Sequence, residues 1–151
     1  MAIPEPLMRL LRIPDSSKVL SVVSTDGFPH SIVLGSIVVD DGMLYAGEVF
    51  MHRTVGYLES NPNVEFLVWK GRSGYSIRAV AEARLTEGPA FEKIRSELGR
   101  MGMEAVAAWR FRPLDASDES ATPDAGDKVF RWRFRGSGSW PRHPPSLRRY
   151  A

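Results

Sequence analysis

Short apolar segments separated by tight-turn signals recur along the chain, and this pattern constrains the fold more than any other feature. KVLSVVST (18–25), HSIVLGSIVV (30–39) and MLYAGEV (43–49) are rich in β-branched and apolar residues, which is typical of strands. TDGFP separates the first two segments and DDG the next two, and Asp-Gly pairs favour hairpin turns. The sequence predicts a meander of three antiparallel strands, in which Gly35 marks a bulge or a close backbone approach.

The remaining segments add helices and further strands to this pattern. Apolar periodicity and turn residues predict helices over 4–13, 54–60 and 88–102, and strands over 63–70, 75–87 and 128–135. Hairpins dominate the order of elements. We therefore expect a mainly β fold, an antiparallel barrel or curved sheet with peripheral helices.

The length and composition favour a single domain over residues 1–151. The chain has 151 residues, of which 43% are hydrophobic and 25% charged, an ordinary globular balance. Within it, the polar, acidic stretch PLDASDESATPDAGD (113–127) predicts a mobile loop, and residues 136–151 predict an irregular tail.

Several classes of chemistry are excluded by what the sequence lacks. Cysteine is absent, which removes disulfides, thiolate nucleophiles and cysteine-based metal sites. The three histidines, His30, His52 and His143, are not spaced as metal ligands, so we expect no metal site. No apolar run is long enough to span a membrane, and the first residues lack a signal-peptide pattern, so a cytoplasmic protein is expected.

Charge is distributed unevenly along the chain. The net charge is +2, but residues 128–151 carry seven Lys or Arg and no acidic residue. The strand FRWRFR within this segment has two interpretations. Alternating arginines and aromatic rings can bind single-stranded nucleic acid, whereas a period of two is typical of an amphipathic strand with its aromatics in the core. We favour the strand, so a nucleic-acid partner is not expected; a third option is that its arginines bind an anionic cofactor or substrate.

The stretch MHRTVGYLES (51–60) places basic and hydroxyl residues where a strand gives way to a helix. A helix N-terminus has unpaired N–H groups and a partial positive charge, which favour a phosphate. Arg53 adds a forked donor, Thr54 can cap the helix and offer its hydroxyl, and His52 adjoins them. The alternative is a capped surface helix with a solvated arginine.

Three spaced motifs resemble one known family. MHRTVGYLESNPNVEFLVW, GYSIRAVAEARLTE and GPAFEKI are similar in order and spacing to the FMN-binding split β-barrel family, the flavoproteins related to pyridoxamine 5′-phosphate oxidase. The resemblance covers residues 16–98 and is closest to the small bacterial FMN-binding proteins. It implies a homodimeric split β-barrel with a cofactor site at the dimer interface.

The resemblance also assigns roles to individual positions. Arg53 and Thr54 fall where the family binds the FMN phosphate, and His52 lies beside them. Ser31, Val33 and Leu34 fall on the strand that lines the ribityl chain and ring edge, while Gly47 and Glu48 fall beside the isoalloxazine. From the residues themselves, Tyr75 and Trp69 could stack on a ring or belong to the core or interface. No catalytic residue is indicated, because a flavin supplies its own redox chemistry.

The sequence departs from the family at three of these positions. Ser31 stands where the oxidase has an Arg that helps hold the phosphate, Ser36 where it has a Lys near the flavin, and Ala79 where the family has Gly. Pyridoxamine phosphate oxidase activity itself is therefore not expected. We expect an FMN-dependent oxidoreductase acting on a small molecule. The alternatives are a relative that binds F420 or haem in the same place, and a cofactor-free dimeric binding module.

Overall fold

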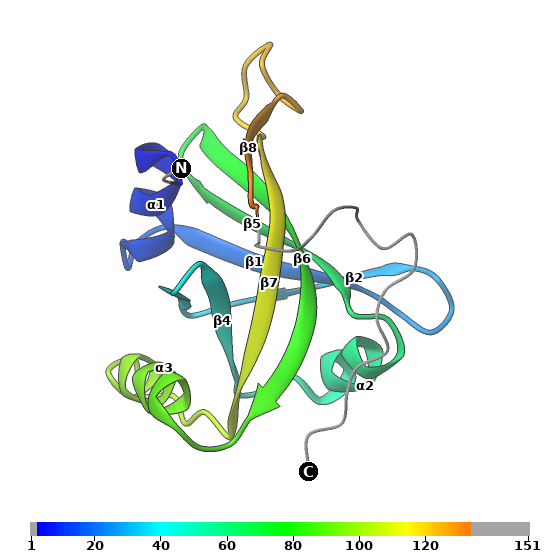
Figure 1. The fold of residues 1–151 in the computed structure, drawn as a ribbon, viewed down its shortest axis with the longest axis vertical. Helices are drawn as coiled ribbons and strands as arrows, with labels where there is room; N and C mark the ends of the chain where they lie inside the picture. The colour runs from blue at the N-terminus through cyan, green and yellow to red at the C-terminus, as the bar shows by residue number, and fades with distance from the viewer. Residues whose placement is uncertain (1–2, 134–151) are drawn as a thin grey trace.

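A computed structural model describes residues 3–133, which form eight strands and three helices (Figure 1). In chain order the elements are α1 (Glu5–Arg12), β1 (Ser17–Val23), β2 (Pro29–Val33), β3 (Ile37–Asp40), β4 (Met43–Glu48), α2 (His52–Ser60), β5 (Asn63–Lys70), β6 (Ser73–Leu85), α3 (Pro89–Gly99), β7 (Ala107–Asp118) and β8 (Lys128–Arg131). The prediction of a mainly β, antiparallel fold with peripheral helices is confirmed. The predicted tail, residues 136–151, lies outside the described residues.

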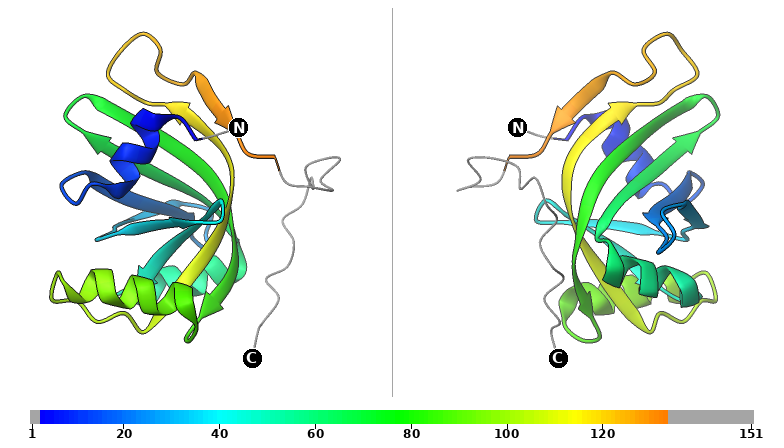
Figure 2. Two further views of the ribbon diagram at one scale, coloured as in Figure 1. Left: turned by 60° about the vertical axis from the view of Figure 1, so that its left-hand side comes forward. Right: turned by 90° about the vertical axis from the view of Figure 1, so that its right-hand side faces the viewer.

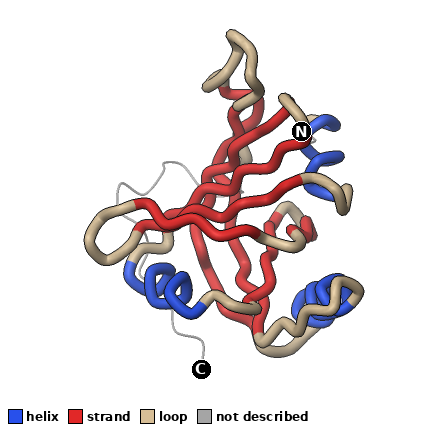
Figure 3. Tube along the Cα trace, turned by 180° about the vertical axis from the view of Figure 1, so that it is seen from behind, coloured by secondary structure: helices blue, strands red, loops and turns tan. Residues whose placement is uncertain are grey.

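All eight strands belong to one antiparallel sheet that curls on itself (Figures 1 and 3). The order is β2-β1-β5-β6-β7-β4-β3, and β8 pairs with β7. β2 and β3 follow each other in the chain yet stand at opposite ends of this order, so residues 34–36 join the two ends. The Leu34 N–H still donates to the Lys18 carbonyl at 2.9 Å. The chain thus forms a partly open barrel.

This closure corrects the predicted three-strand meander. β2 pairs with β1, and β3 pairs with β4, but the segment predicted as one strand over 30–39 is divided between the two pairs. The break lies at Gly35, where an added Cβ would stand 2.5 Å from Cε of Met103. The expected close approach is present, and it is made by side chains of the segment after α3.

The barrel interior forms the larger of two apolar clusters. Phe66 of β5 and Phe111 of β7 meet edge to face with their ring centroids 5.0 Å apart, and both are fully buried. Helix α1 adds Leu7 and Leu11 to this cluster (Figure 2). A smaller cluster under α3 contains Phe91, Ile94 and Leu98 packed against β3, β4 and β7, with Val38, Tyr45, Ala105 and Ala108. Burial of this apolar surface is the main stabilising contribution to the fold.

The loop predicted over residues 113–127 is wrong in its first part. β7 runs from Ala107 to Asp118, and only the chain between Asp118 and Lys128 forms turns. Pro113 lacks an N–H donor, and the β6–β7 register shifts beside it, between Arg78 and Ala79. Such a bulge accommodates a proline inside a long strand. The polar, acidic composition of this stretch therefore predicted a loop where β7 continues.

The basic strand β8 follows the amphipathic interpretation. Phe130 and Trp132 meet edge to face at 4.6 Å, and Trp132 is 6% exposed, whereas Arg131 and Arg133 are exposed. β8 also binds the sheet through Lys128 Nζ, which lies 3.1 Å from a carboxylate oxygen of the buried Asp115. The aromatic residues of β8 therefore pack on the body of the protein.

Candidate functional site

Within residues 3–133, helix α2 begins with backbone donors that no side-chain cap satisfies. Its first residue is His52, two residues before the predicted start, and the first intrahelical bond runs from the Val55 N–H to the carbonyl of the N-cap, Met51. The N–H groups of His52, Arg53 and Thr54 precede that bond, and among the described residues no side chain caps this end of the helix. The first turn therefore presents donors and the positive end of the helix dipole.

The sequence suggests Thr54 as a helix cap, but in the structure Thr54 does not cap α2. It joins the helix to the sheet instead. Its side chain is 1% exposed, and its Oγ1 makes a 3.2 Å hydrogen bond with Nε2 of His30 at the start of β2. The His30 ring also meets the Tyr57 ring edge to face, with centroids 5.3 Å apart. Through these contacts the first turn of α2 is fixed against β2.

Arg53 is exposed and held in place by a neighbour on its own helix. Its Nη2 donates to the Tyr57 hydroxyl at 3.2 Å, and its guanidinium lies 5.9 Å from the centroid of the Tyr57 ring. Across from it, Asp26 in the β1–β2 turn has a pKa below its ordinary value, chiefly because Ser24 donates a hydrogen bond and in small part because of Arg53. The guanidinium therefore lies near that turn, and in the described residues it has no ion pair.

Two predicted residues, Ser31 and Val33, lie on the outer face of β2 beside this corner. Both are exposed, and Ser31 Oγ shares a 2.8 Å hydrogen bond with Ser21 Oγ of β1. Leu34 lies in the apolar core, so only its backbone could meet a ligand. β2 pairs only with β1 among the described strands, which leaves backbone groups along its other edge free.

The two predicted residues of β4 have structural partners. A Cβ at Gly47 would come closer than 3.0 Å to side-chain atoms of Leu98 and Ile94, so Gly47 allows α3 to pack on β4. Glu48 is buried and accepts hydrogen bonds from Arg84 Nη2 at 2.6 Å and from Trp109 Nε1 at 3.1 Å. Burial raises the pKa of Glu48, but the bonds from Arg84 and Trp109 outweigh it, and the pKa lies below the ordinary value.

Tyr75 and His52 complete the predicted set. Tyr75 is half-buried in β6, opposite Val68 and Asp118, and its pKa is raised by burial and by the charge of Asp118. It lies three strands from β2 and is not part of the α2 corner. His52 is exposed in the first turn of α2, near enough to Glu48 for its charge to lower the pKa of that carboxyl slightly.

Sequence reasoning missed one residue of this corner and the partner of another. For His30 at a strand start the sequence favours a structural hydrogen bond, and its contact with Thr54 confirms this without the partner having been predicted, whereas Tyr57, which positions Arg53, was not singled out. The spacing of four between Arg53 and Tyr57 was a usable signal, because such residues share a helix face. The contact between His30 and Thr54 depends on how β2 meets α2, which one sequence does not show.

The geometry favours an organic anion over a metal at this corner. Among residues 3–133, no group of three or more His, Asp or Glu side chains is arranged to hold a metal ion. The donors at the first turn of α2 and the guanidinium of Arg53 instead suit phosphate oxygens. Within the same residues, no helix is long and apolar enough to cross a membrane.

Comparisons with known proteins agree with this fold. The structure is similar to that of HupZ from Group A Streptococcus, with a TM-score of 0.68 and 22% identity over 83% of this chain and 100% of that chain. It is also similar to an FMN-binding protein from Syntrophomonas wolfei (TM-score 0.64, 18% identity, 77% and 83% covered) and to an F420 reductase (0.63, 18%, 76% and 98%). These similarities concern the fold.

Sequence comparison identifies the family. No curated protein sequence matches the chain significantly. A family model described as pyridoxamine 5′-phosphate oxidase, however, matches residues 13–134, which include every described strand and helices α2 and α3. This chain therefore belongs to the pyridoxamine 5′-phosphate oxidase family.

Proposed function

We propose that this chain is an FMN-binding oxidoreductase that acts on a small molecule as a cytoplasmic homodimer. The phosphate of the cofactor would lie at the first turn of α2, and its ring along the outer face of β2. Membership of the family and the similarity to an FMN-binding protein support this proposal. The observation that carries it is the α2 corner, where the first-turn N–H groups, Arg53 and the Thr54–His30 contact lie on α2 beside β2, which pairs only with β1 among the described strands.

The corner meets the chemical requirements of a phosphate monoester. Three N–H groups and the Arg53 guanidinium are donors suited to its oxygens, while the buried Thr54 hydroxyl bonds His30 and holds this turn against β2. Tyr57 holds the guanidinium in one orientation, which reduces the conformational entropy lost on binding. The family Arg at the position of Ser31 is absent here, so Arg53 rather than two arginines would balance the charge of the phosphate.

The outer face of β2 fits the flavin ring through backbone and apolar groups. Free N–H and C=O groups along its unpaired edge can bond the polar edge of the ring, and Val33, 83% exposed, offers an apolar surface. When bound, the flavin supplies the redox chemistry, accepting and releasing electrons or hydride. The residues of this chain would orient the ring and exclude water from it.

Large exposed apolar side chains support the proposed homodimer. Phe28, Val33 and Phe50 are 69%, 83% and 79% exposed, and they lie on the β1–β2 turn, on β2 and just before α2. These segments flank the α2 corner (Figure 2). A second copy of the chain on this face would bury these side chains and cover the cofactor. Apolar groups gathered on one face are typical of interaction sites.

The proposal is tested by titrating the purified protein with FMN and following flavin fluorescence. We expect saturable binding, and we expect Arg53→Gln to weaken it by about 1.5–3 kcal/mol, which is roughly 10- to 150-fold, because a charge-assisted contact is lost. Arg72→Gln, an exposed arginine in the β5–β6 turn, is the matched control and should bind FMN normally. Equal affinity of the Arg53 variant and the control would remove Arg53 from the site.

The similarity to an F420 reductase supports a second candidate, binding of the deazaflavin F420 at the same corner. Parallel titrations with FMN, F420 and haem separate the candidates, because the three have different absorption spectra. Preference for F420 would keep the corner as the site and change the cofactor. Failure of all three to bind would favour a cofactor-free binding module.

A further inference from the structure

The short segment that joins β2 to β3 closes the barrel, and the end of α3 packs against it. An added Cβ at Gly35 would stand 3.1 Å from Cδ2 of Leu98, the last buried residue of α3. It would also stand 2.5 Å from Cε of Met103 and 3.3 Å from Sδ of Met101. The N–H groups of Met101 and Met103 both donate to the Leu98 carbonyl at 3.0 Å, which fixes the turn that carries them. Two methionine side chains are thereby held against the backbone of the closing segment.

Met101 is the exposed member of this pair. It is 45% exposed, whereas Met103 is half-buried and Met51, in the barrel interior, is 5% exposed. Met8 and Met43 are also half-buried, so within residues 3–133 Met101 is the methionine most open to solvent. The chain has no cysteine, so thioethers are its only sulfur groups. Oxidation at sulfur, which follows exposure, should therefore begin at Met101.

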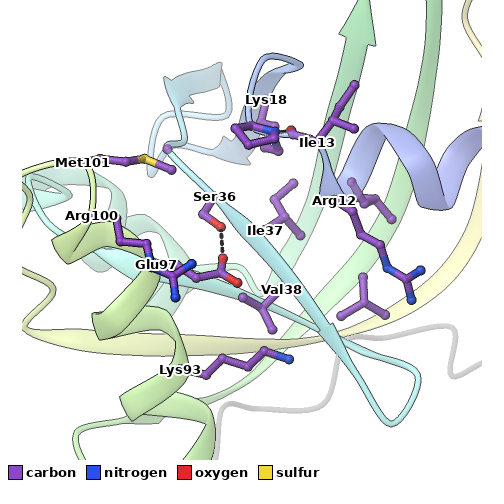
Figure 4. A pocket seen from close by; sticks show the side chains of 14 residues that line it. Arg12, Ile13, Lys18, Ser36, Ile37, Val38, Lys93, Glu97, Arg100 and Met101 are labelled. Carbon is purple, nitrogen blue, oxygen red and sulfur yellow. Dashed lines mark hydrogen bonds between the residues drawn. The ribbon is translucent and has the colours of Figure 1, made fainter.

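A cavity of about 420 Å³ opens beside Met101. The end of α1, residues 35–39, among them Ser36, and helix α3 line it, and Figure 4 shows the Met101 side chain extending toward the start of β3. Such a cavity admits hydrogen peroxide, which is little larger than a water molecule, whose share of liquid volume is about 30 Å³. A small oxidant can therefore reach a side chain that also packs on the closing segment.

We propose that Met101 is an oxidation site for small peroxides, and that its conversion to the sulfoxide loosens the attachment of α3 to the segment that closes the barrel. Two contacts would remain after oxidation. They are the packing of Leu98 and the 2.5 Å hydrogen bond that Ser36 Oγ donates to Oε2 of Glu97 (Figure 4). The site does not depend on the proposed flavin site, because the sulfur and its contacts lie outside the α2 corner.

The oxidation needs no group other than the thioether and the peroxide. A sulfur lone pair attacks one oxygen of hydrogen peroxide, and an S–O bond forms as the O–O bond breaks. The departing hydroxide takes the proton of the transferred oxygen and leaves as water. The sulfur loses two electrons, which the peroxide gains. The product, methionine sulfoxide, is polar and chiral where the thioether was apolar, and methionine sulfoxide reductase reverses the step.

The sulfoxide oxygen would weaken the contact with the closing segment. Against Leu98 and the Gly35 backbone it would lose water, which costs free energy for a polar group. On the outer side, solvent and the exposed guanidinium of Arg100 can donate hydrogen bonds to it. The oxidised side chain is therefore more stable away from Gly35, and α3 loses one of its contacts there.

The first test measures which methionines of the full chain are oxidised by limiting hydrogen peroxide. Trypsin cleaves after Arg100, so Met101 and Met103 lie in one peptide, in which tandem mass spectrometry distinguishes them. We expect Met101 to be oxidised about 3-fold faster than Met103 and about 10-fold faster than Met51, in the order of their exposure. In urea, where the chain is unfolded, the three rates should agree within about 2-fold.

The second test measures the consequence for the fold. Oxidation to one added oxygen per chain should lower the melting temperature by about 3 °C, and methionine sulfoxide reductase should restore it. Met101→Leu keeps an apolar side chain of similar size without sulfur, so the same treatment should shift its melting temperature by less than about 1 °C. The matched control Met8→Leu, at a half-buried position on α1, should show the full decrease. Met101→Gln, which places a polar amide at the contact, should reproduce the decrease without peroxide.

Three outcomes would overturn the proposal. The first is oxidation of Met101 no faster than that of Met103 or Met51 in the folded protein. The second is an equal decrease in melting temperature for Met101→Leu and the unchanged chain, which would assign the effect to another methionine. The third is rapid oxidation of Met101 with no decrease at all, which would show that its contact does not hold α3. FMN titration of untreated protein reports on the flavin site separately.

Discussion

Helices α2 and α3 both connect strands of the same barrel, yet they are attached to it in different ways. α3 buries Phe91, Ile94 and Leu98 in a cluster of their own, and Gly47 of β4 lets it approach the sheet closely. α2 buries only Thr54 and Leu58. α3 is thus held by close packing, whereas α2 is held by a few contacts that leave its first turn accessible.

The difference indicates how this fold separates stability from binding. The buried side of α3 packs against β3, β4 and β7 in an apolar cluster. The α2 corner instead relies on polar contacts among His30, Thr54 and Tyr57. Changes near α3 should therefore affect mainly stability, while changes at α2 should affect mainly ligand affinity. The following variants test that division.

Gly47→Val should produce the largest effect. The new side chain would collide with Leu98 and Ile94 and push α3 away from β4, so we expect a loss of about 3 kcal/mol in the free energy of unfolding. Urea denaturation followed by circular dichroism measures this loss. A change below about 0.5 kcal/mol would show that α3 is not clamped by this contact.

Glu48→Gln should have the next largest effect, because Glu48 links the segment before α2 to the segment before α3. Its carboxylate is bound by Arg84, just before α3, and by Trp109. Removal of its charge should cost about 2 kcal/mol of stability, less than for a fully buried pair because Arg84 is 41% exposed. Glu87→Gln, an exposed change just before α3, is the control.

The lowered pKa of the Glu48 carboxylate predicts that the protein becomes less stable at acidic pH. The folded-state pKa of Glu48 lies below its ordinary value of 4.5, and that of Asp115 lies below 3.8 because its bonds from Arg78 and Lys128 outweigh burial. A depressed folded-state pKa stabilises the protein above the unfolded-state pKa, and this contribution is lost as the pH falls through the folded-state pKa. We expect the melting temperature to decrease as the pH is lowered from about 4.5. The decrease should be smaller in Glu48→Gln.

Thr54→Val should have a smaller effect on stability. The valine keeps the shape but leaves His30 Nε2 without its partner, which should cost about 1 kcal/mol. If the corner binds a phosphate, the same variant should also lose affinity for FMN. Thr25→Val, an exposed change in the β1–β2 turn, should affect neither. A variant with normal stability and normal flavin affinity would contradict the proposed role of this hydroxyl.

Gly56→Ala should have the smallest effect, and in the opposite direction. A Cβ at Gly56 meets nothing within 4 Å, so alanine gains helix propensity without a clash. The expected gain is about 0.8 kcal/mol. A loss of stability at Gly47 together with a gain at Gly56 would show that α3 is closely packed on the sheet and α2 is not. A destabilised Gly56 variant would mean that α2 packs more closely than its burial indicates.

The sequence predicted local structure well and long-range pairing less well. Strand β5 was predicted with its observed bounds, and α1, β6 and α3 within a few residues, because periodicity and turn residues are local signals. Strand β7 was missed, since Pro113 and the acidic residues around it resemble a loop. Its assignment depends on pairing with β4 and β6, which are distant in the sequence.

The candidate site was predicted in the same uneven way. The run His52-Arg53-Thr54 identified the first turn of α2, because helix termini have a local signature. The roles of Gly47 and Glu48 stay predictions as far as a cofactor is concerned, and the structure adds packing and ionic partners for them. The cavity that Ser36 lines was not predicted, because its residues come from the end of α1, from β1, from the segment 35–39 and from α3, which are far apart in the sequence.

The corner at Gly35 links residues that are far apart in the chain. An added Cβ there would meet Met103, Leu98 and Met101 within 3.3 Å, all from the end of α3 and the turn after it. A larger residue at position 35 therefore requires the Met103 side chain to move, and a smaller residue at one of these three positions would relieve the contact. Among relatives that keep this barrel closure, we expect position 35 and positions 98, 101 and 103 to change size in compensating steps, so that the four behave as one evolutionary unit.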